Sequence, residues 1–108
     1  DAKFFYSDDF EIDEAMVDKK WSPKSEGQIS LLKEYFKNNH FEDSKDAEER
    51  TKAFLQENGI GMGEIFPILR LALTGTLKGP DLFQTITILG KPKVIERLEK
   101  LLLRMKSS

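Results

Sequence analysis

The chain has 108 residues, of which 39% are apolar and 33% charged, a balance typical of one small globular domain. No apolar stretch approaches the roughly 20 residues that cross a bilayer, so we expect no membrane association. The sequence contains no cysteine, which excludes disulfides and thiolate metal sites and favours a cytoplasmic protein. The first residue is Asp1, and we therefore expect a piece of a longer protein.

Charge is distributed unevenly about a net value of −2. Residues 1–20 carry seven acidic and three basic side chains, whereas residues 91–108 carry six basic and two acidic ones. A negative net charge argues against a non-specific nucleic-acid binder, whose affinity depends on many phosphate contacts. The basic C-terminal end either lies against RNA phosphates or is a solvated helix face, and charge alone favours the solvated face.

Residues 1–21 are predicted to be an extended lead-in from a preceding domain, with at most a helical turn over 13–19. Their many carboxylates would repel one another in a helix, and their spacing matches no calcium loop. The aromatic side chains of this segment are bunched at Phe4, Phe5, Tyr6 and Phe10. We expect these aromatic rings to dock on a neighbouring domain.

Residues 22–108 are predicted to form one all-α domain of about five helices. Ser22 and Pro23 favour a first helix start, and the helix is expected to fail near Asn38. Asp43 or Ser44 caps a second helix, which Asn58 and Gly59 end. The inward-facing positions of these two helices are predicted at Ile29, Leu32, Phe36, Ala47, Phe54 and Leu55.

The remaining three helices follow with short connections. The third starts around Gly61–Gly63, tolerates Pro67 near its start and ends at Gly75. The fourth is predicted from Pro80 to Gly90, and the fifth starts at Pro92. Their buried stripes are predicted at Ile65, Ile68, Leu69, Ala72 and Leu73, at Leu82, Phe83, Ile86 and Leu89, and at Val94, Ile95, Leu98, Leu101 and Leu102.

The β-branched run Thr85–Ile88 is the one feature that also suits a short strand. Glycine and proline on both sides of it favour a helix. With short connections between all the helices, the sequence predicts a compact orthogonal helical bundle.

No group of residues forms a recognisable catalytic or metal site. His40 is the single histidine and has no cysteine or second histidine to share a metal, so we interpret it as a loop or cap residue. Gly59–Gly63 leads into a helix but lacks the Gly-Lys-Ser/Thr ending of a P-loop, which favours a flexible turn over a phosphate cradle. We predict no catalytic and no metal-binding residue.

RNA recognition needs fewer charges, because loop bases are stacked on planar groups and hydrogen-bonded at their edges. Arg70 supplies a planar fork of donors, and Gly79 leaves the backbone unshielded. Pro80 offers a flat apolar ring, and Leu82 and Phe83 could form an apolar surface against which a base packs. The alternative is a purely structural role, in which Leu82 and Phe83 are core residues and Arg70 is an ordinary surface arginine.

The order of these segments resembles the C-terminal anticodon-binding domain of bacterial glutamyl-tRNA synthetases. The resemblance covers essentially the whole chain, and Ile12-Asp13 stands where the family typically has a Tyr-Asp pair. It is carried by Phe4-Phe5-Tyr6, Lys19-Lys20-Trp21, Leu69 to Gly75, Gly79 to Phe83, Leu89-Gly90 and Arg97-Leu98-Glu99.

The resemblance implies a helical cage that holds the anticodon loop of the glutamate tRNA. By position, Arg70 would meet the anticodon bases, and Gly79, Pro80, Leu82 and Phe83 would contact a base. Some relatives carry a side-chain hydroxyl where this chain has Gly79, so only backbone groups are available there. We further expect phosphate contacts from the basic residues Lys78, Arg97, Lys100 and Arg104.

The resemblance also places ATP, magnesium and glutamate in a distant N-terminal catalytic domain of class I. Neither nucleotide-binding signature of that domain occurs here, so this piece alone is expected to be non-catalytic and to bind no cofactor. Its expected partners are the glutamate tRNA and the preceding domains, and we expect a monomer. The alternative is an all-α protein-interaction module without independent RNA binding.

Overall fold

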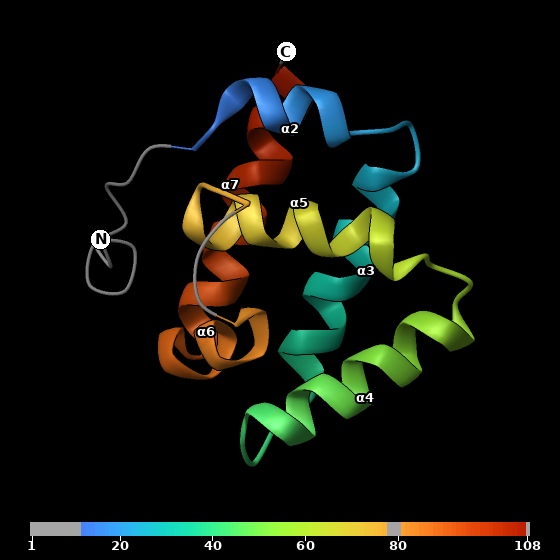
Figure 1. Cartoon of the computed structure of the whole chain (residues 1–108), viewed down its shortest axis with the longest axis vertical. Helices are drawn as coiled ribbons and strands as arrows, with labels where there is room; N and C mark the ends of the chain where they lie inside the picture. The colour runs from blue at the N-terminus through green and yellow to red at the C-terminus, as the bar shows by residue number, and fades with distance from the viewer. Residues whose placement is uncertain (1–11, 78–80, 108) are drawn as a thin grey trace.

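The computed structural model describes residues 12–77 and 81–107, and within these ranges it contains six α-helices and no strand (Figure 1). The helices are α2 (Glu14–Lys20), α3 (Ser25–Asn38), α4 (Ser44–Glu57), α5 (Met62–Thr74), α6 (Leu82–Leu89) and α7 (Lys91–Ser107). The predicted all-α class is confirmed. The aromatic residues Phe4, Phe5, Tyr6 and Phe10 lie outside the described residues.

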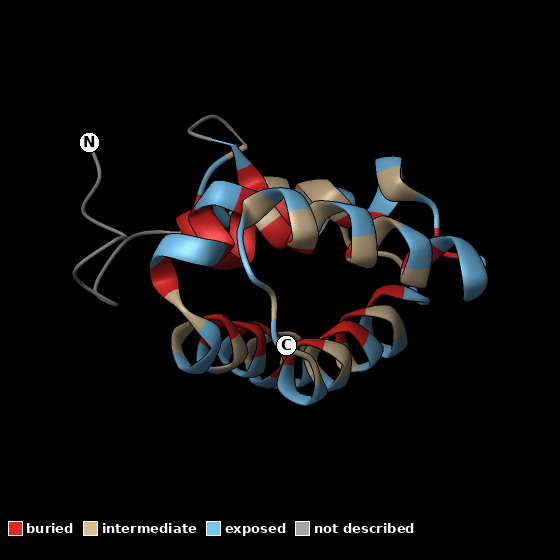
Figure 2. Cartoon of the chain, turned by 90° about the horizontal axis from the view of Figure 1, so that it is seen from below, coloured by how far each residue is buried: buried red, intermediate tan, exposed pale blue. Residues whose placement is uncertain are grey.

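The helices cross at steep angles around one core, as Figure 1 shows for α5 against α3 and α7. α3 packs along α7, and α5 packs on both of them. Buried residues line the inward sides of the helices and exposed residues their outer sides (Figure 2). Each fully buried aliphatic side chain stabilises the fold by about 1.5–3 kcal/mol. The largest are Ile29, Leu32, Leu55, Ile65, Ile68, Leu69, Leu71, Leu73, Leu98 and Leu101.

The helical turn expected over residues 13–19 of the lead-in is longer in the structure, where residues 14–20 form the seven-residue helix α2. The Asp13 carboxylate caps this helix by accepting a hydrogen bond from the Met16 amide at 3.2 Å. Val17 is 1% exposed against the core, and Glu14 forms an ion pair with Arg104 of α7 at 2.7 Å. The helix thus depends on contacts with distant residues, which local sequence does not reveal.

The fourth predicted helix begins at Leu82 rather than at Pro80, because Asp81 is its N-cap. The Asp81 carboxylate accepts hydrogen bonds from the amides of Phe83 and Gln84, both at 3.0 Å. The alternative of a strand over residues 85–88 is excluded by the helix. There the hydroxyls of Thr85 and Thr87 donate to the carbonyls one turn earlier, each at 2.9 Å.

Candidate nucleic-acid interface

The C-terminal end of α5 is fixed by its own backbone and by α2. Gly75 adopts a left-handed conformation with φ 83°, which favours glycine, and its amide bonds to the Leu71 carbonyl. Its carbonyl accepts a hydrogen bond of 2.8 Å from the Asp13 amide. The Thr74 hydroxyl contacts the carbonyls of Arg70 at 2.7 Å and Thr76 at 2.9 Å. The chain therefore leaves α5 in a defined direction.

Arg97 of α7 reaches the same end of α5 from inside the molecule. Its side chain is 3% exposed, and Nη1 donates a hydrogen bond of 2.7 Å to the Leu73 carbonyl. This buried position differs from the exposed phosphate contact that the sequence predicted. The sequence did hold a signal, because Arg97 lies three residues after Val94 and four before Leu101 on the buried stripe.

One face of α5 stays partly open to solvent. Gly63, Phe66, Pro67 and Arg70 follow an i, i+3, i+4, i+7 spacing, which places them along one side of the helix. All four are half-buried or exposed, whereas Ile65, Ile68 and Leu69 between them are buried in the core. We call these four residues the open face of α5. Arg70, the predicted base reader, lies at its C-terminal end.

Leu82 and Phe83 at the start of α6 are buried, with exposures of 3% and 4%. Phe83 packs edge-on against Phe66, with ring centroids 5.6 Å apart and planes at 82°. Phe66 is half-buried and stands one turn before Arg70. Phe66 therefore shares one side of α5 with Arg70 and contacts Phe83, and it was not among the residues predicted for the site.

The other predicted contacts are divided between two places. Lys78, Gly79 and Pro80 lie outside the described residues. Lys100 and Arg104 lie on α7, and each forms an ion pair, with Glu96 at 3.5 Å and with Glu14 at 2.7 Å.

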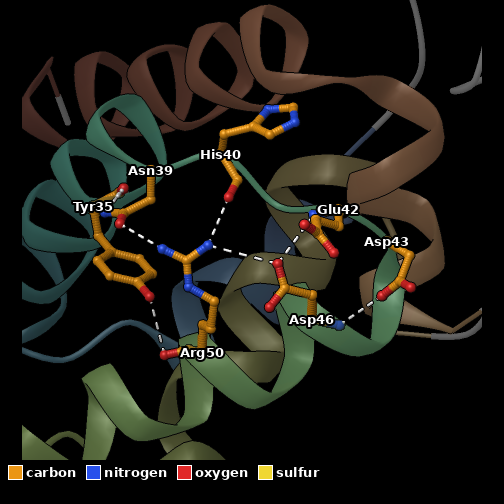
Figure 3. Close-up of polar contacts among 7 residues, drawn as sticks. All are labelled: Tyr35, Asn39, His40, Glu42, Asp43, Asp46 and Arg50. Carbon is orange, nitrogen blue, oxygen red and sulfur yellow. Dashed lines mark hydrogen bonds and ion pairs between the residues drawn. The ribbon is translucent and has the colours of Figure 1, made fainter.

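The single histidine, His40, follows the C-terminal end of α3, where Arg50 forms hydrogen bonds with the loop after the helix (Figure 3). Arg50 donates to the His40 carbonyl at 2.6 Å and to the Asn39 side-chain oxygen at 2.8 Å. Its guanidinium also lies 3.6 Å from an Asp46 oxygen and 5.0 Å from the centre of the Phe41 ring. The cluster therefore holds backbone in place, and only the backbone carbonyl of His40 takes part.

Tyr35 belongs to the same cluster and donates its hydroxyl to the Arg50 carbonyl at 3.1 Å. Burial raises the pKa of this hydroxyl above its ordinary value of 10.0, and the nearby Arg50 charge opposes the rise only in part. Across the described ranges, no three His, Asp or Glu side chains gather to hold a metal ion. No helix there has the length and apolar character to span a membrane.

Comparison with known proteins places this geometry in a family. Residues 1–102 match the family model described as "Anticodon binding domain". The chain is 33% identical over 97 residues to the glutamate–tRNA ligase of Flavobacterium johnsoniae, covering 90% of this chain and 19% of that protein. It is 31% identical over 104 residues to the glutamate–tRNA ligase of Thermus thermophilus, covering 94% and 21%.

A solved structure agrees with these sequence matches. A crystal structure of a glutamate tRNA ligase from Elizabethkingia meningosepticum in complex with its amino acid superimposes with a TM-score of 0.83. The identity is 32%, and the match covers 94% of this chain and 20% of that one. The chain thus spans about a fifth of the length of these relatives. The resemblance inferred from the sequence is confirmed: this chain belongs to the anticodon binding domain family.

Proposed function

We propose that this chain is the anticodon-recognition domain of a glutamate–tRNA ligase and that it holds the anticodon loop of the glutamate tRNA. The observation that carries the proposal is the open face of α5, which ends in Arg70, five residues before the fixed turn at Gly75. Phe66 of this face contacts Phe83 at the start of α6. The proposal is supported by relatives that are glutamate–tRNA ligases over nearly the whole of this chain.

In this function, Arg70 reads an unstacked base, because its planar guanidinium both stacks on a ring and donates to base-edge acceptors. Phe66 adds an aromatic surface one turn away, and Phe83 supports it from behind. Gly79 and Pro80 contribute backbone groups and an apolar ring from the connection to α6, and the buried Leu82 anchors the start of that helix. Lys78 contacts a neighbouring phosphate of the RNA backbone.

The basic terminal helix takes a smaller share of RNA binding. Lys100 and Arg104 would each have to exchange an existing ion pair for a phosphate contact, which reduces the net gain. Arg97 acts from the interior by holding the Leu73 carbonyl rather than by touching RNA.

The chemistry of aminoacylation belongs to the remainder of the ligase. ATP, Mg²⁺ and glutamate bind there, in a class I catalytic domain, and this domain positions the tRNA for it. The preceding domains are its protein partners, and the assembled enzyme is a cytoplasmic monomer.

The direct test is an NMR titration of the labelled chain with a stem–loop RNA that carries the glutamate anticodon, beside one with a scrambled loop. We expect shifts at Arg70, Phe66 and residues 81–83 with the cognate loop only. Equal shifts with both loops, or shifts confined to other helices, would contradict base reading by this domain. Absence of any shift at low salt would favour the interaction-module alternative.

A further inference from the structure

A groove of about 490 Å³ lies at the other end of the open face of α5. It is bordered by the end of α2, the α2–α3 connection and the first turn of α5. In Figure 1, α2 and α5 lie side by side, and their right-hand ends meet the start of α3 here. Its lining includes Lys19, Lys20, Ser22, Lys24, Gly63 and Glu64.

The three lysines of this groove lack the ionic contacts that five other long cationic side chains of this molecule make. Lys33, Lys52, Lys100, Arg50 and Arg104 each form an ion pair with a carboxylate. In the part of the chain that the structure describes, Lys19, Lys20 and Lys24 form none. All three are exposed. Positive charge that no carboxylate neutralises is available to an external anion.

The connection that carries Lys24 is held in shape before any ligand arrives. The Ser22 amide donates to the Ser25 hydroxyl at 2.9 Å, and the two hydroxyls lie 3.2 Å apart. The Lys24 amide donates to the Ser22 hydroxyl at 3.3 Å. Because the turn is already ordered, only the flexible lysine side chains lose freedom when an anion binds.

The charges of the lining select an anion with several negative groups. Three lysines face a single carboxylate, that of Glu64, which leaves the groove positively charged. Lysine binds phosphate as a mobile point charge without demanding a fixed geometry. A chain of phosphates such as the RNA backbone therefore fits the site better than one small anion.

The groove is continuous with the base-reading end of α5. Gly63 lines the groove and Arg70 follows it by seven residues, so the two lie two turns apart on the same face, about 10 Å along the axis. Phe66 and Pro67 bridge that interval and are only half-buried. One RNA strand thus has a surface that leads from Arg70 to the lysines.

We propose that Lys19, Lys20 and Lys24 form a phosphate-binding groove for the RNA backbone on the strand that leaves the base read by Arg70. This inference rests on the proposed function. It transfers the main phosphate contacts from the terminal helix, where Lys100 and Arg104 are paired and Arg97 is buried, to the end of α2.

The test measures the affinity of the chain for the cognate stem–loop by fluorescence anisotropy at several salt concentrations. The variant Lys19→Gln/Lys20→Gln/Lys24→Gln should bind more weakly with a shallower salt dependence. About 0.7 counterion is released for each of the three single-strand phosphate contacts. The loss of affinity of this variant relative to the unaltered chain should therefore shrink about 20-fold between 50 and 200 mM salt. The ratio of cognate to scrambled-loop affinity should stay unchanged. Glu64→Gln should tighten binding by about two- to fivefold, since one repelling charge is removed.

The matched control is Lys37→Gln/Lys45→Gln/Lys91→Gln, which removes three exposed lysines at the far end of α3 and changes net charge equally. It should keep nearly the full salt dependence. Equal losses in both triple variants, or no loss in the groove variant, would overturn the groove. If poly-glutamate bound through the same lysines more tightly than the cognate stem–loop does, the groove would be overturned in favour of an acidic protein partner.

Failure of base reading gives a different pattern from failure of the groove. If cognate and scrambled loops bind alike but the groove lysines still set the salt dependence, the groove stands and recognition by Arg70 fails. If the cognate loop is preferred and the groove variant binds normally, recognition stands and the groove fails. No binding by the unaltered chain at 50 mM salt would overturn both.

Discussion

Arg97 and Leu73 are joined by a 2.7 Å hydrogen bond from a buried guanidinium to a main-chain carbonyl oxygen. The bond ties α7 to the last turn of α5, only three residues beyond Arg70. The carbonyl groups in the last turn of a helix have no partner within the helix, and Arg97 supplies one of them with a donor. The terminal helix therefore supports the C-terminal end of α5, where Arg70 lies, from within the core.

Replacing Arg97 with methionine should lower the free energy of unfolding by about 1–3 kcal/mol, because the Leu73 carbonyl is left buried without this donor. Thermal unfolding would report the loss as a drop of roughly 4–8 °C per kcal/mol. The matched variant Lys100→Met removes an exposed cation from the same helix and should change stability by less than about 0.5 kcal/mol. Equal stability of the two variants would contradict the supporting role.

Replacing Gly75 or Gly27 with alanine should change the free energy of unfolding in opposite directions. Gly75 has φ 83°, so alanine there is strained, and Gly75→Ala should destabilise the protein by about 1–2 kcal/mol. Gly27 lies in α3 with no atom within 4 Å of an added Cβ, and Gly27→Ala should stabilise it by up to about 1 kcal/mol. Denaturant unfolding measures both. The account of the α5 terminus is contradicted if Gly75→Ala proves neutral.

Thr51 and Thr85 are both fully buried but differ in their hydroxyl groups. Across the described ranges, the Thr51 hydroxyl finds no hydrogen-bond partner, whereas that of Thr85 donates to the Asp81 carbonyl at 2.9 Å. Thr51→Val should therefore raise the unfolding free energy by about 1 kcal/mol, and Thr85→Val should lower it by a similar amount. Melting curves of the two variants should move in opposite directions.

The raised pKa of Tyr35 predicts a loss of stability in alkali. The unfolded chain ionises this phenol near pH 10.0, while the folded chain keeps it neutral to higher pH. Its contribution is therefore fully present below pH 10.0 and is lost as pH rises through the folded pKa. Comparing unfolding free energies at pH 9 and 11, the Tyr35→Phe variant should lose less stability than the unaltered chain. A parallel loss in both proteins would contradict the prediction.

The long helices were predictable because their apolar stripes and caps are local features. For example, α5 is specified by its apolar stripe of Ile65, Ile68 and Leu69 and by the helix end at Gly75. Only a helical turn was predicted where α2 lies, because seven residues do not hold a helix unaided. The contacts of α2 with α5 and Arg104 arise only in the folded chain.

The candidate site was predictable only in part. Arg70 and Phe83 were considered from their residue types and assigned to the anticodon through a family resemblance. Phe66 was not predicted, and it contacts Phe83 because α6 folds back onto α5. The pairing of charges cannot be read from composition. The terminal helix is the most basic part of the sequence, yet the groove with three unpaired lysines among the described residues lies at the end of α2.

The measurement that tests base reading most directly is the discrimination of Arg70→Ala between anticodon loops. The unaltered chain and the variant are titrated with the cognate stem–loop and with loops changed at one anticodon base each. We predict a loss of about 1–3 kcal/mol on the cognate loop and a smaller loss on the loop changed at the base that Arg70 reads, so that preference there is relaxed. An equal loss on every loop would contradict the account, because Arg70 would then hold RNA without reading its sequence.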